Sequence, residues 1–288
     1  MFYSHSGAIK GPARFAGLNG RQARLLLILL ILWTGLSGAR AQSDFRWPSG
    51  AEAAVCLTYD DGLDCHLDIA APALELHGFR GTFYVTGRSS SLFHRMDAWR
   101  QMAKNGHELG NHTLFHPCHG DQFDWVLPEY DLNRYTFPQL MSELEVANSL
   151  LKAVDGREVR SFAYTCTHST IEGISFADSI HGLFPSARGG GPLPMEMEQV
   201  DLYNVPSWGV EDPTGEELIA YVEEALTKGT MAVFMFHSVG GGYLNTSEKA
   251  HETLLEYLDA NRERIWTAPF LEVTQYVRSV RGSAEDAP

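Results

Sequence analysis

The sequence predicts an α/β fold in which a closed parallel sheet is covered by helices. Short apolar runs alternate regularly with segments of helical periodicity, a pattern typical of strand–helix–strand units. About seven strand-like segments occur in the 247 residues that follow position 41, which favours a barrel over an open sheet. With 44% hydrophobic and 20% charged residues, the composition excludes a disordered chain, a collagen-like fibre and a coiled coil.

Residues 1–41 are expected to form a secretory signal peptide. Basic residues without acidic ones precede an unbroken apolar run at 25–33, and Ala39-Arg40-Ala41 is a small-x-small cleavage pattern. The apolar run is shorter than the roughly 20 residues of a membrane-spanning helix. We therefore expect residues 42–288 to form one exported barrel domain, periplasmic or extracellular. The alternative is an uncleaved N-terminal membrane anchor.

The charge of the chain argues against several classes of partner. The chain has 22 Lys and Arg against 36 Asp and Glu, a formal charge of −14, and without residues 1–41 the charge is −19. Binding to nucleic acid or to an anionic membrane requires clustered cations, so neither is expected. Strongly anionic polymers are disfavoured as ligands for the same reason. The sequence carries no signal for an oligomeric state.

The first half of the domain is predicted to alternate three strands with two helices. Residues 53–59 and 81–87 are apolar runs bounded by turn residues, as in buried parallel strands, and 107–110 form a short third strand. Residues 67–76 have apolar side chains at helical spacing and stop before a glycine, and 95–104 form the next helix.

The second half continues the alternation. A helix at 139–154 carries apolar side chains at helical spacing. It is followed, in order, by a strand at 159–164, a helix at 171–181, strands at 184–188 and 203–208, a helix at 214–228, a strand at 231–236, and helices at 247–263 and 270–280.

Four cysteines follow residue 41: Cys56, Cys65, Cys118 and Cys166. Export permits disulfides, and four cysteines allow three pairings. Cys56 lies within an apolar run, which favours a buried free thiol. No Cys-x-x-Cys pair occurs, so a cysteine-based zinc knuckle is not expected.

Candidate catalytic residues follow the predicted strands, where a barrel carries its chemistry. The first strand ends in Asp60-Asp61-Gly62. Of two adjacent carboxylates, one can bind a metal while the other stays free as a base. The alternative is a turn, since Asp-Gly favours tight turns.

Two histidines follow the third strand. His112 and His116 are four positions apart, so on one helical turn both imidazoles lie on the same face and can share a metal of the zinc type. The alternative is a pair of surface or hydrogen-bonded core histidines.

Two further candidates follow later strands. His237 comes directly after the strand at 231–236, where it can act as a general acid or can serve in capping or packing. Trp208 ends another strand, where it can wall a small apolar pocket or lie in the core.

Five motifs follow one another along the chain: Thr58-Tyr59-Asp60-Asp61-Gly62, Gly110-Asn111-His112-Thr113-x-x-His116, Ser161-Phe162-Ala163-Tyr164, Trp208 and Phe236-His237. In this order they resemble the motifs of the polysaccharide deacetylases, the NodB-homology group of carbohydrate esterase family 4. The resemblance covers roughly residues 50–280. It implies a distorted (β/α)7 barrel and metal-dependent removal of acetyl groups from an N- or O-acetylated carbohydrate, with an acetylated glycan as the partner.

The resemblance also implies roles for individual residues. It makes Asp61, His112 and His116 the ligands of a divalent metal, with Zn²⁺ as the first choice. It makes Asp60 the catalytic base and His237 the catalytic acid. It also makes the amide of Cys166 a donor to the oxyanion. In this reading the metal activates a water that attacks the acetyl carbonyl. No covalent intermediate is required.

The sequence departs from the family pattern at two motifs. Many members carry Arg-Pro-Pro-Tyr-Gly in the third motif, where this chain has the segment 163–167 without an arginine. We hypothesise that Arg188 supplies the missing cation, and the alternative is a solvated surface arginine. Ser207 precedes Trp208 where an aspartate is usual, and Asp201, Glu211 and Asp212 are the candidates to orient His237 in its place.

Two other functions stay open at this point. The altered third motif also suits a hydrolase of a non-sugar amide on the same barrel, and a non-catalytic glycan-binding module is the other alternative. Loop 117–138 holds five aromatic side chains, which can stack on sugar rings or bury against the barrel.

Overall fold

The structure is a computed structural model of the chain, and it describes residues 45–285. The predicted signal peptide at 1–41 lies outside the described residues, as do the first residues of the predicted domain. Within residues 45–285, no helix has the length and apolar character needed to cross a membrane.

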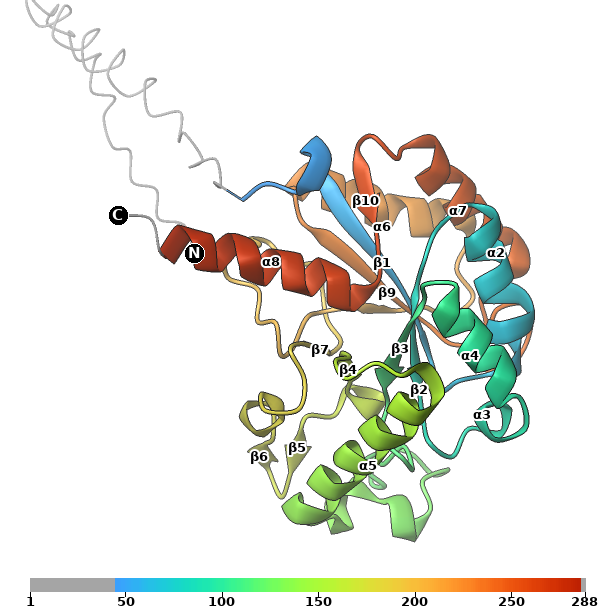
Figure 1. The fold of residues 1–288 in the computed structure, drawn as a ribbon, viewed down its shortest axis with the longest axis vertical. Helices are drawn as coiled ribbons and strands as arrows, with labels where there is room; N and C mark the ends of the chain where they lie inside the picture. Colours follow the sequence, from blue (N-terminus) through green and yellow to red (C-terminus); the bar gives the residue numbers. More distant parts are fainter. Residues whose placement is uncertain (1–44, 286–288) are drawn as a thin grey trace, which may run out of the picture. The chain divides into compact units, whose positions relative to one another are not determined.

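A parallel sheet forms the centre of the domain (Figure 1). Its strands are β1 (Ala53–Asp60), β2 (Thr82–Val85), β3 (Glu108–Asn111), β4 (Phe162–Ala163), β7 (Ala187–Arg188), β8 (Trp208–Gly209), β9 (Met231–Phe236) and β10 (Ile265–Thr267). The order in the sheet is β7-β4-β3-β2-β1-β9-β8, and β10 pairs with the beginning of β1. The predicted α/β class with a parallel sheet is confirmed.

The segment 205–209 closes this sheet into a distorted barrel of seven strands. On one side Val205 pairs with Arg188 of β7, and on the other side β8 pairs with β9. Backbone bonds from Gly189 N to Val205 O (2.9 Å) and from Val210 N to Met235 O (3.1 Å) secure the two seams. The barrel is distorted because β4, β7 and β8 are only two residues long.

Helices cover the outside of the sheet and one end of the barrel (Figure 1). They are α2 (Ala71–Leu76), which continues a π-helical turn at His66–Ala70, α3 (Ser90–His94), α4 (Met96–Lys104), α5 (Phe137–Asp155), α6 (Gly215–Lys228), α7 (Glu248–Ala260) and α8 (Phe270–Glu285). The helices at 67–76, 95–104, 139–154, 214–228, 247–263 and 270–280 were each predicted within a few residues of these bounds.

The residues of β1 alternate between two apolar cores. Leu57 and Tyr59 belong to the core between the sheet and its outer helices, whereas Ala54 and Cys56 belong to the core inside the barrel. Side chains of α8 close the bottom of the inner core, with Phe270 fully buried there. Because successive side chains of a strand point to opposite faces, Asp60 continues the inward set.

Local capping explains why α6 matches its prediction. The Thr214 side chain accepts a hydrogen bond from Glu217 N, while the Glu217 carboxylate accepts one from Thr214 N, which forms a capping box. The helix ends at Gly229, whose φ of 69° is left-handed.

The helix predicted at 171–181 is wrong. Residues 170–171 and 174–175 form a small antiparallel hairpin, β5 (Thr170–Ile171) with β6 (Ile174–Ser175). Its two-residue turn has φ of 51° at Glu172 and 75° at Gly173, the left-handed values that a tight hairpin needs. The isoleucines on either side of the turn imitated helical spacing. The short elements β10 and α3 were not predicted.

Candidate active site

A cleft of about 910 Å³ opens at the carboxyl ends of the strands. Six of the predicted site residues line it: Asp60, Asp61, His112, His116, Cys166 and His237. Aromatic side chains form much of its wall. The topology therefore brings together residues that are up to 177 positions apart, because parallel strands all end at the same rim.

The end of β1 directs its two carboxylates differently. Asp60 is the last residue of the strand, and its side chain is buried. Asp61 has φ of 77° and Gly62 has φ of 66°, so the chain turns sharply after the strand. The turn predicted as an alternative is thus present, and it directs the Asp61 carboxylate toward the histidines.

The two histidines do not lie on a helical turn, so that prediction is wrong. β3 ends at Asn111, and the residues that follow form a loop in which Thr113 has φ of 62° and His116 has φ of 57°. Side chains brace this loop: Asn111 Oδ1 accepts from Thr113 N (2.8 Å), and Thr113 Oγ1 accepts from His116 N (2.9 Å). The loop thereby brings both imidazoles to the same place without helical geometry.

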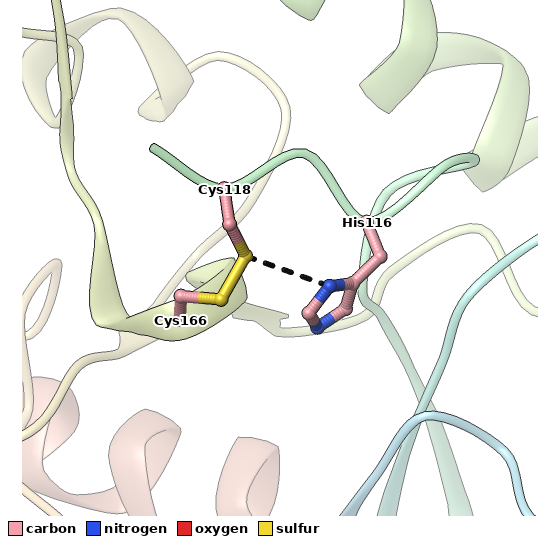
Figure 2. Close-up of side chains that lie close together, drawn as sticks. All are labelled: His116, Cys118 and Cys166. Atoms are coloured by element: carbon pink, nitrogen blue, oxygen red, sulfur yellow. Dashed lines mark hydrogen bonds between the residues drawn. A yellow bond between two sulfur atoms is a disulfide. The ribbon is translucent and has the colours of Figure 1, made fainter. Parts of the chain in front are cut away.

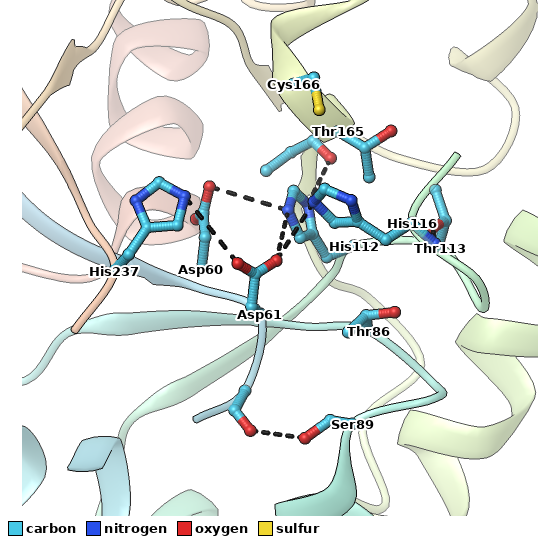
Figure 3. Close-up of polar contacts among 12 residues, drawn as sticks. Asp60, Asp61, Thr86, Ser89, His112, Thr113, His116, Thr165, Cys166 and His237 are labelled. Carbon is cyan, nitrogen blue, oxygen red and sulfur yellow. Dashed lines mark hydrogen bonds and ion pairs between the residues drawn. The ribbon is translucent and has the colours of Figure 1, made fainter. Parts of the chain in front are cut away.

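Asp61, His112 and His116 form a compact cluster (Figure 3). Asp61 Oδ1 lies 3.2 Å from His116 Nε2 and 3.5 Å from His112 Nε2, and one donor atom from each residue lies within 4.8 Å of the others. Burial opposes ionisation of Asp61, yet the adjacent His116 holds the pKa of this carboxyl well below its usual range. Burial lowers the pKa of His112 to about 4.

The cluster fits a divalent metal ion. His112 Nδ1 donates to Ala163 O (2.9 Å), so its Nε2 keeps a lone pair directed at Asp61. Asp61 Oδ1 is buried without a hydrogen-bond partner among residues 45–285, and a metal ion would satisfy it. Two imidazoles and one carboxylate are ligands that Zn²⁺ accepts.

Asp60 is held by Arg188 inside the barrel. Arg188 Nη2 donates to Asp60 Oδ2 (2.5 Å), and the guanidinium carbon lies 4.9 Å from the ring centre of Tyr84. Arg188 is only 1% exposed, so the surface role considered for it is wrong. Asp60 Oδ1 makes no hydrogen bond within the described part of the chain and stays available.

His237 faces the cluster from β9, with Nε2 3.9 Å from Asp61 Oδ2. Its backbone carbonyl accepts from His66 Nε2 (2.9 Å). Its Nδ1 is buried without a hydrogen-bond partner in residues 45–285. None of the acidic residues predicted to orient it bonds to this nitrogen: Asp201, Glu211 and Asp212. These three candidates are therefore wrong as hydrogen-bond partners of this nitrogen.

A disulfide joins the histidine loop to the third motif (Figure 2). Cys118 and Cys166 are bonded, and Cys118 Sγ lies 3.6 Å from His116 Nδ1. Cys56 is a buried free thiol, as expected, and Cys65 is also free. His116, Cys118 and Cys166 are close enough together for a metal, but two sulfurs in a disulfide are not thiolate ligands.

Trp208 does not line the cleft, which corrects its prediction as a substrate residue. Its ring packs on Tyr221 of α6 (5.2 Å between centres) and on Phe234 of β9 (6.0 Å). It therefore points outward from the barrel, toward α6. The alternation of side chains along β8 explains this orientation.

The aromatic residues of loop 117–138 divide between the two predicted roles. Phe123, Trp125 and Tyr130 line the cleft, and Trp125 is 60% exposed. Tyr135 is buried in the core near α5, whereas Phe137 begins that helix and is partly exposed.

One residue of the site was not predicted. Tyr243 Oη donates to Asp61 Oδ2 (2.5 Å), on the carboxylate oxygen that faces away from His112 and His116. Tyr243 follows three consecutive glycines with positive φ, Gly240 to Gly242. Glycines in a row predict a loop but not where that loop carries a side chain.

Comparison with known proteins supports the same family. Residues 48–170 match the family model described as polysaccharide deacetylase. The chain is 24% identical over 256 residues to a gellan lyase of Bacillus sp., covering 80% of this chain and 10% of that protein. It is 34% identical over 67 residues to the peptidoglycan-N-acetylglucosamine deacetylase of Bacillus cereus, covering 23% of this chain and 24% of that protein. The chain thus matches only a minor part of either relative.

Solved structures share the fold. A protein of Mycobacterium smegmatis described as a polysaccharide deacetylase superposes with a TM-score of 0.60 at 14% identity, covering 82% of this chain and 94% of that one. A family 4 acetyl xylan esterase of Clostridium thermocellum, solved with a cobalt ion, gives 0.52 at 18% identity, covering 80% and 92%.

The resemblance to the polysaccharide deacetylases is therefore confirmed, and so is the barrel that it implied. The family-model match ends at residue 170. Arg188 and His237 lie beyond it, and their place in the site rests on the geometry given above.

Proposed function

We propose that this protein is an exported, metal-dependent hydrolase that removes acetyl groups from an N- or O-acetylated glycan. The observation that carries the proposal is the cluster of Asp61, His112 and His116, whose donor atoms lie within 4.8 Å of one another beside Asp60 and His237. The two curated relatives named above act, by their names, on gellan and on peptidoglycan, which favours a polysaccharide substrate.

The metal would be held by Asp61 Oδ1 and by Nε2 of His112 and His116, and Zn²⁺ is our first choice. When bound, such an ion polarises a carbonyl group and lowers the pKa of a water molecule. These three side chains leave the cleft side of the cluster open, as a catalytic site requires and a structural zinc site does not.

Asp60 is suited to act as the base. Its Oδ2 is fixed by Arg188 and its Oδ1 is free, so one oxygen can take a proton from the attacking water without losing its hydrogen bond. The oxygen of that water then bonds to the acetyl carbon. The amide of Cys166, which lines the cleft, is proposed as a donor to the resulting oxyanion.

His237 is suited to act as the acid. It lines the same cleft across from the histidine loop. As the bond from the acetyl carbon to the sugar nitrogen or oxygen breaks, His237 gives its proton to the leaving atom. The products are acetate and a free amine or hydroxyl, and the proton on Asp60 leaves with solvent.

The disulfide supports export. Disulfides form and persist in oxidising compartments, and the Cys118–Cys166 bond lies at the site itself. Together with the predicted signal peptide at 1–41, it leads us to propose that the protein works in the periplasm or outside the cell.

The experiment is acetate release from acetylated chito-oligosaccharides and from acetyl-xylan, with metal analysis of the same sample. We expect release that a chelator abolishes and added Zn²⁺ restores. Asp60→Asn should keep its metal and lose at least about 100-fold in kcat, because it removes the base but no ligand.

Two results would replace the proposal. Metal binding and glycan binding without turnover on any acetylated sugar would indicate a glycan-binding module. Acetate release from simple N-acetyl amides but from no sugar would indicate a hydrolase of non-sugar amides.

A further inference from the structure

One cation on the wall of the cleft has no anionic partner within the described part of the chain. Arg88 is the only Lys or Arg among the residues that line the cleft. Among residues 45–285 its side chain makes neither a hydrogen bond nor an ion pair, and its guanidinium carbon lies 4.7 Å from the ring centre of Tyr130. Arg88 is exposed to solvent, so its guanidinium can be reached by a ligand that enters the cleft.

The carboxylates of the cleft are all engaged elsewhere. Asp60 is bonded to Arg188. Asp61 is bonded to Tyr243 and lies beside His112 and His116, and Asp64 lies 2.9 Å from Arg95. None of them neutralises Arg88. The positive charge of Arg88 is therefore available to a ligand in the cleft.

Arg88 is held in place by its backbone and by an aromatic stack. Arg88 N donates to Leu114 O (2.9 Å), which ties it to the loop that carries both histidines. Tyr130 lies under the guanidinium and stacks in turn on Phe115, with 5.3 Å between ring centres. A guanidinium that rests its face on a ring keeps its N–H edge free for a bidentate contact.

We propose that Arg88 binds a carboxylate of the substrate, so that the glycan carries an acidic sugar close to the acetylated one. This inference rests on the proposed function and names the substrate class of the same site. A single arginine in a chain of formal charge −14 suits a glycan whose carboxylates are separated by neutral sugars, because a dense polyanion would be repelled.

Two pairs of probes separate the possible sources of the carboxylate. The first pair is an acetylated xylo-oligosaccharide with one glucuronic acid side group and the same compound after reduction of its carboxylate to an alcohol. The second pair is a peptidoglycan disaccharide oligomer, whose carboxylate is on a lactyl ether, and a chito-oligosaccharide of equal length. The pair with the larger ratio identifies the source.

Binding is measured by calorimetry on the Zn²⁺-loaded Asp60→Asn protein, and kcat/KM is measured on the wild type. We expect the carboxylate member of one pair to bind at least tenfold more tightly than its neutral counterpart. Its kcat/KM should be higher by the same factor, because its KM is lower. Arg88→Gln should abolish the ratio, and Arg88→Lys should keep part of it. Arg100→Gln on α4, which removes a cation away from the cleft, should leave the ratio as it is.

The outcomes separate this inference from the proposed function. A binding ratio that depends on Arg88, without acetate release from any probe, would support the carboxylate site and refute the deacetylase. Acetate release with equal binding of both members in both pairs, or a ratio that survives Arg88→Gln, would overturn the inference.

Discussion

Arg188 Nη2 lies 2.5 Å from Asp60 Oδ2, although the two residues are 128 positions apart and sit on β7 and β1, with three strands between them in the sheet. Both side chains are almost completely buried, at 1% and 2% exposed. A buried carboxylate that must take up a proton needs a fixed orientation, and a guanidinium provides one. Arg188 thus lies beside the proposed base in a chain whose third motif has no arginine.

Removal of this cation should impair both activity and folding. We expect Arg188→Met to lower kcat at least tenfold while Zn²⁺ affinity stays within a factor of about three, because Arg188 contacts the base and not a ligand. It should also lower the free energy of unfolding by about 3 kcal/mol, since it leaves the Asp60 carboxylate buried and unpaired.

A double-mutant cycle checks this explanation by urea unfolding. Asp60→Asn combined with Arg188→Met should be more stable than Arg188→Met alone, because the unpaired charge is gone. Equal or lower stability of the double variant, or full activity of Arg188→Met, would contradict it.

Tyr243 should strengthen metal binding through Asp61. Its phenol donates to Asp61 Oδ2 and leaves Oδ1 directed at the histidines. We expect Tyr243→Phe to weaken Zn²⁺ binding about tenfold by calorimetry, in the range known for groups that orient ligands. The matched control is Tyr257→Phe, which removes a phenol of α7 that is bonded to Glu223 of α6. Equal Zn²⁺ affinities of the two variants would contradict a role of Tyr243 in metal binding.

The disulfide should stabilise the histidine loop. The bond closes a loop of 48 residues, and chain entropy alone predicts about 4 kcal/mol of stabilisation. The Cys118→Ser/Cys166→Ser variant should lose stability of this size and bind Zn²⁺ more weakly, because His116 Nδ1 loses its neighbouring sulfur. Cys65→Ser, which removes a free thiol, is the control for denaturation and calorimetry. Unchanged Zn²⁺ affinity would show that the disulfide stabilises the fold but does not support the metal site.

Acid should destabilise the fold through its buried histidines. Burial lowers the pKa of His251 to about 4, so the folded protein keeps this ring neutral while the unfolded chain protonates it below about pH 6.5. The stabilisation is complete above that pH and is lost as the pH falls toward 4. At pH 5 the loss from this residue amounts to about 2 kcal/mol.

The sign of each histidine's effect on the pH dependence of stability can be tested with two variants, by urea unfolding at pH 7 and pH 5. His251→Gln should lose less stability between these values than the wild type. His77→Gln should lose more: burial opposes protonation of His77, but Glu252 and Asp259 outweigh it and raise its pKa, so its stabilisation is present at acid pH. The same change in both variants would contradict the assignment.

The sequence was informative where a segment is long or buried throughout. The strand predicted at 231–236 has the bounds of β9. Six consecutive apolar residues are typical of a parallel strand that is buried on both faces. Asp61 follows β1 and both His112 and His116 follow β3, which was enough to predict that the three meet, because the carboxyl ends of parallel strands share one rim.

What failed in prediction depends on single side chains and short turns. Spacing of four suggested a helical turn for His112 and His116, but the positive φ of Thr113 and His116 allows a loop to reach the same result. Trp208 sits on a two-residue strand, where one step in register decides between the cleft and α6. Tyr243 and the Cys118–Cys166 pairing depend on contacts between loops, which no local pattern encodes.

The pairing of β1 bears on how the site behaves when the protein opens locally. β1 bonds to β2, β9 and β10, more partners than any other strand within residues 45–285. Its amides should therefore exchange with solvent only on global unfolding. We therefore expect the carboxylates at its end to keep their positions during local opening, so that a polymeric substrate can enter without disordering the proposed catalytic groups.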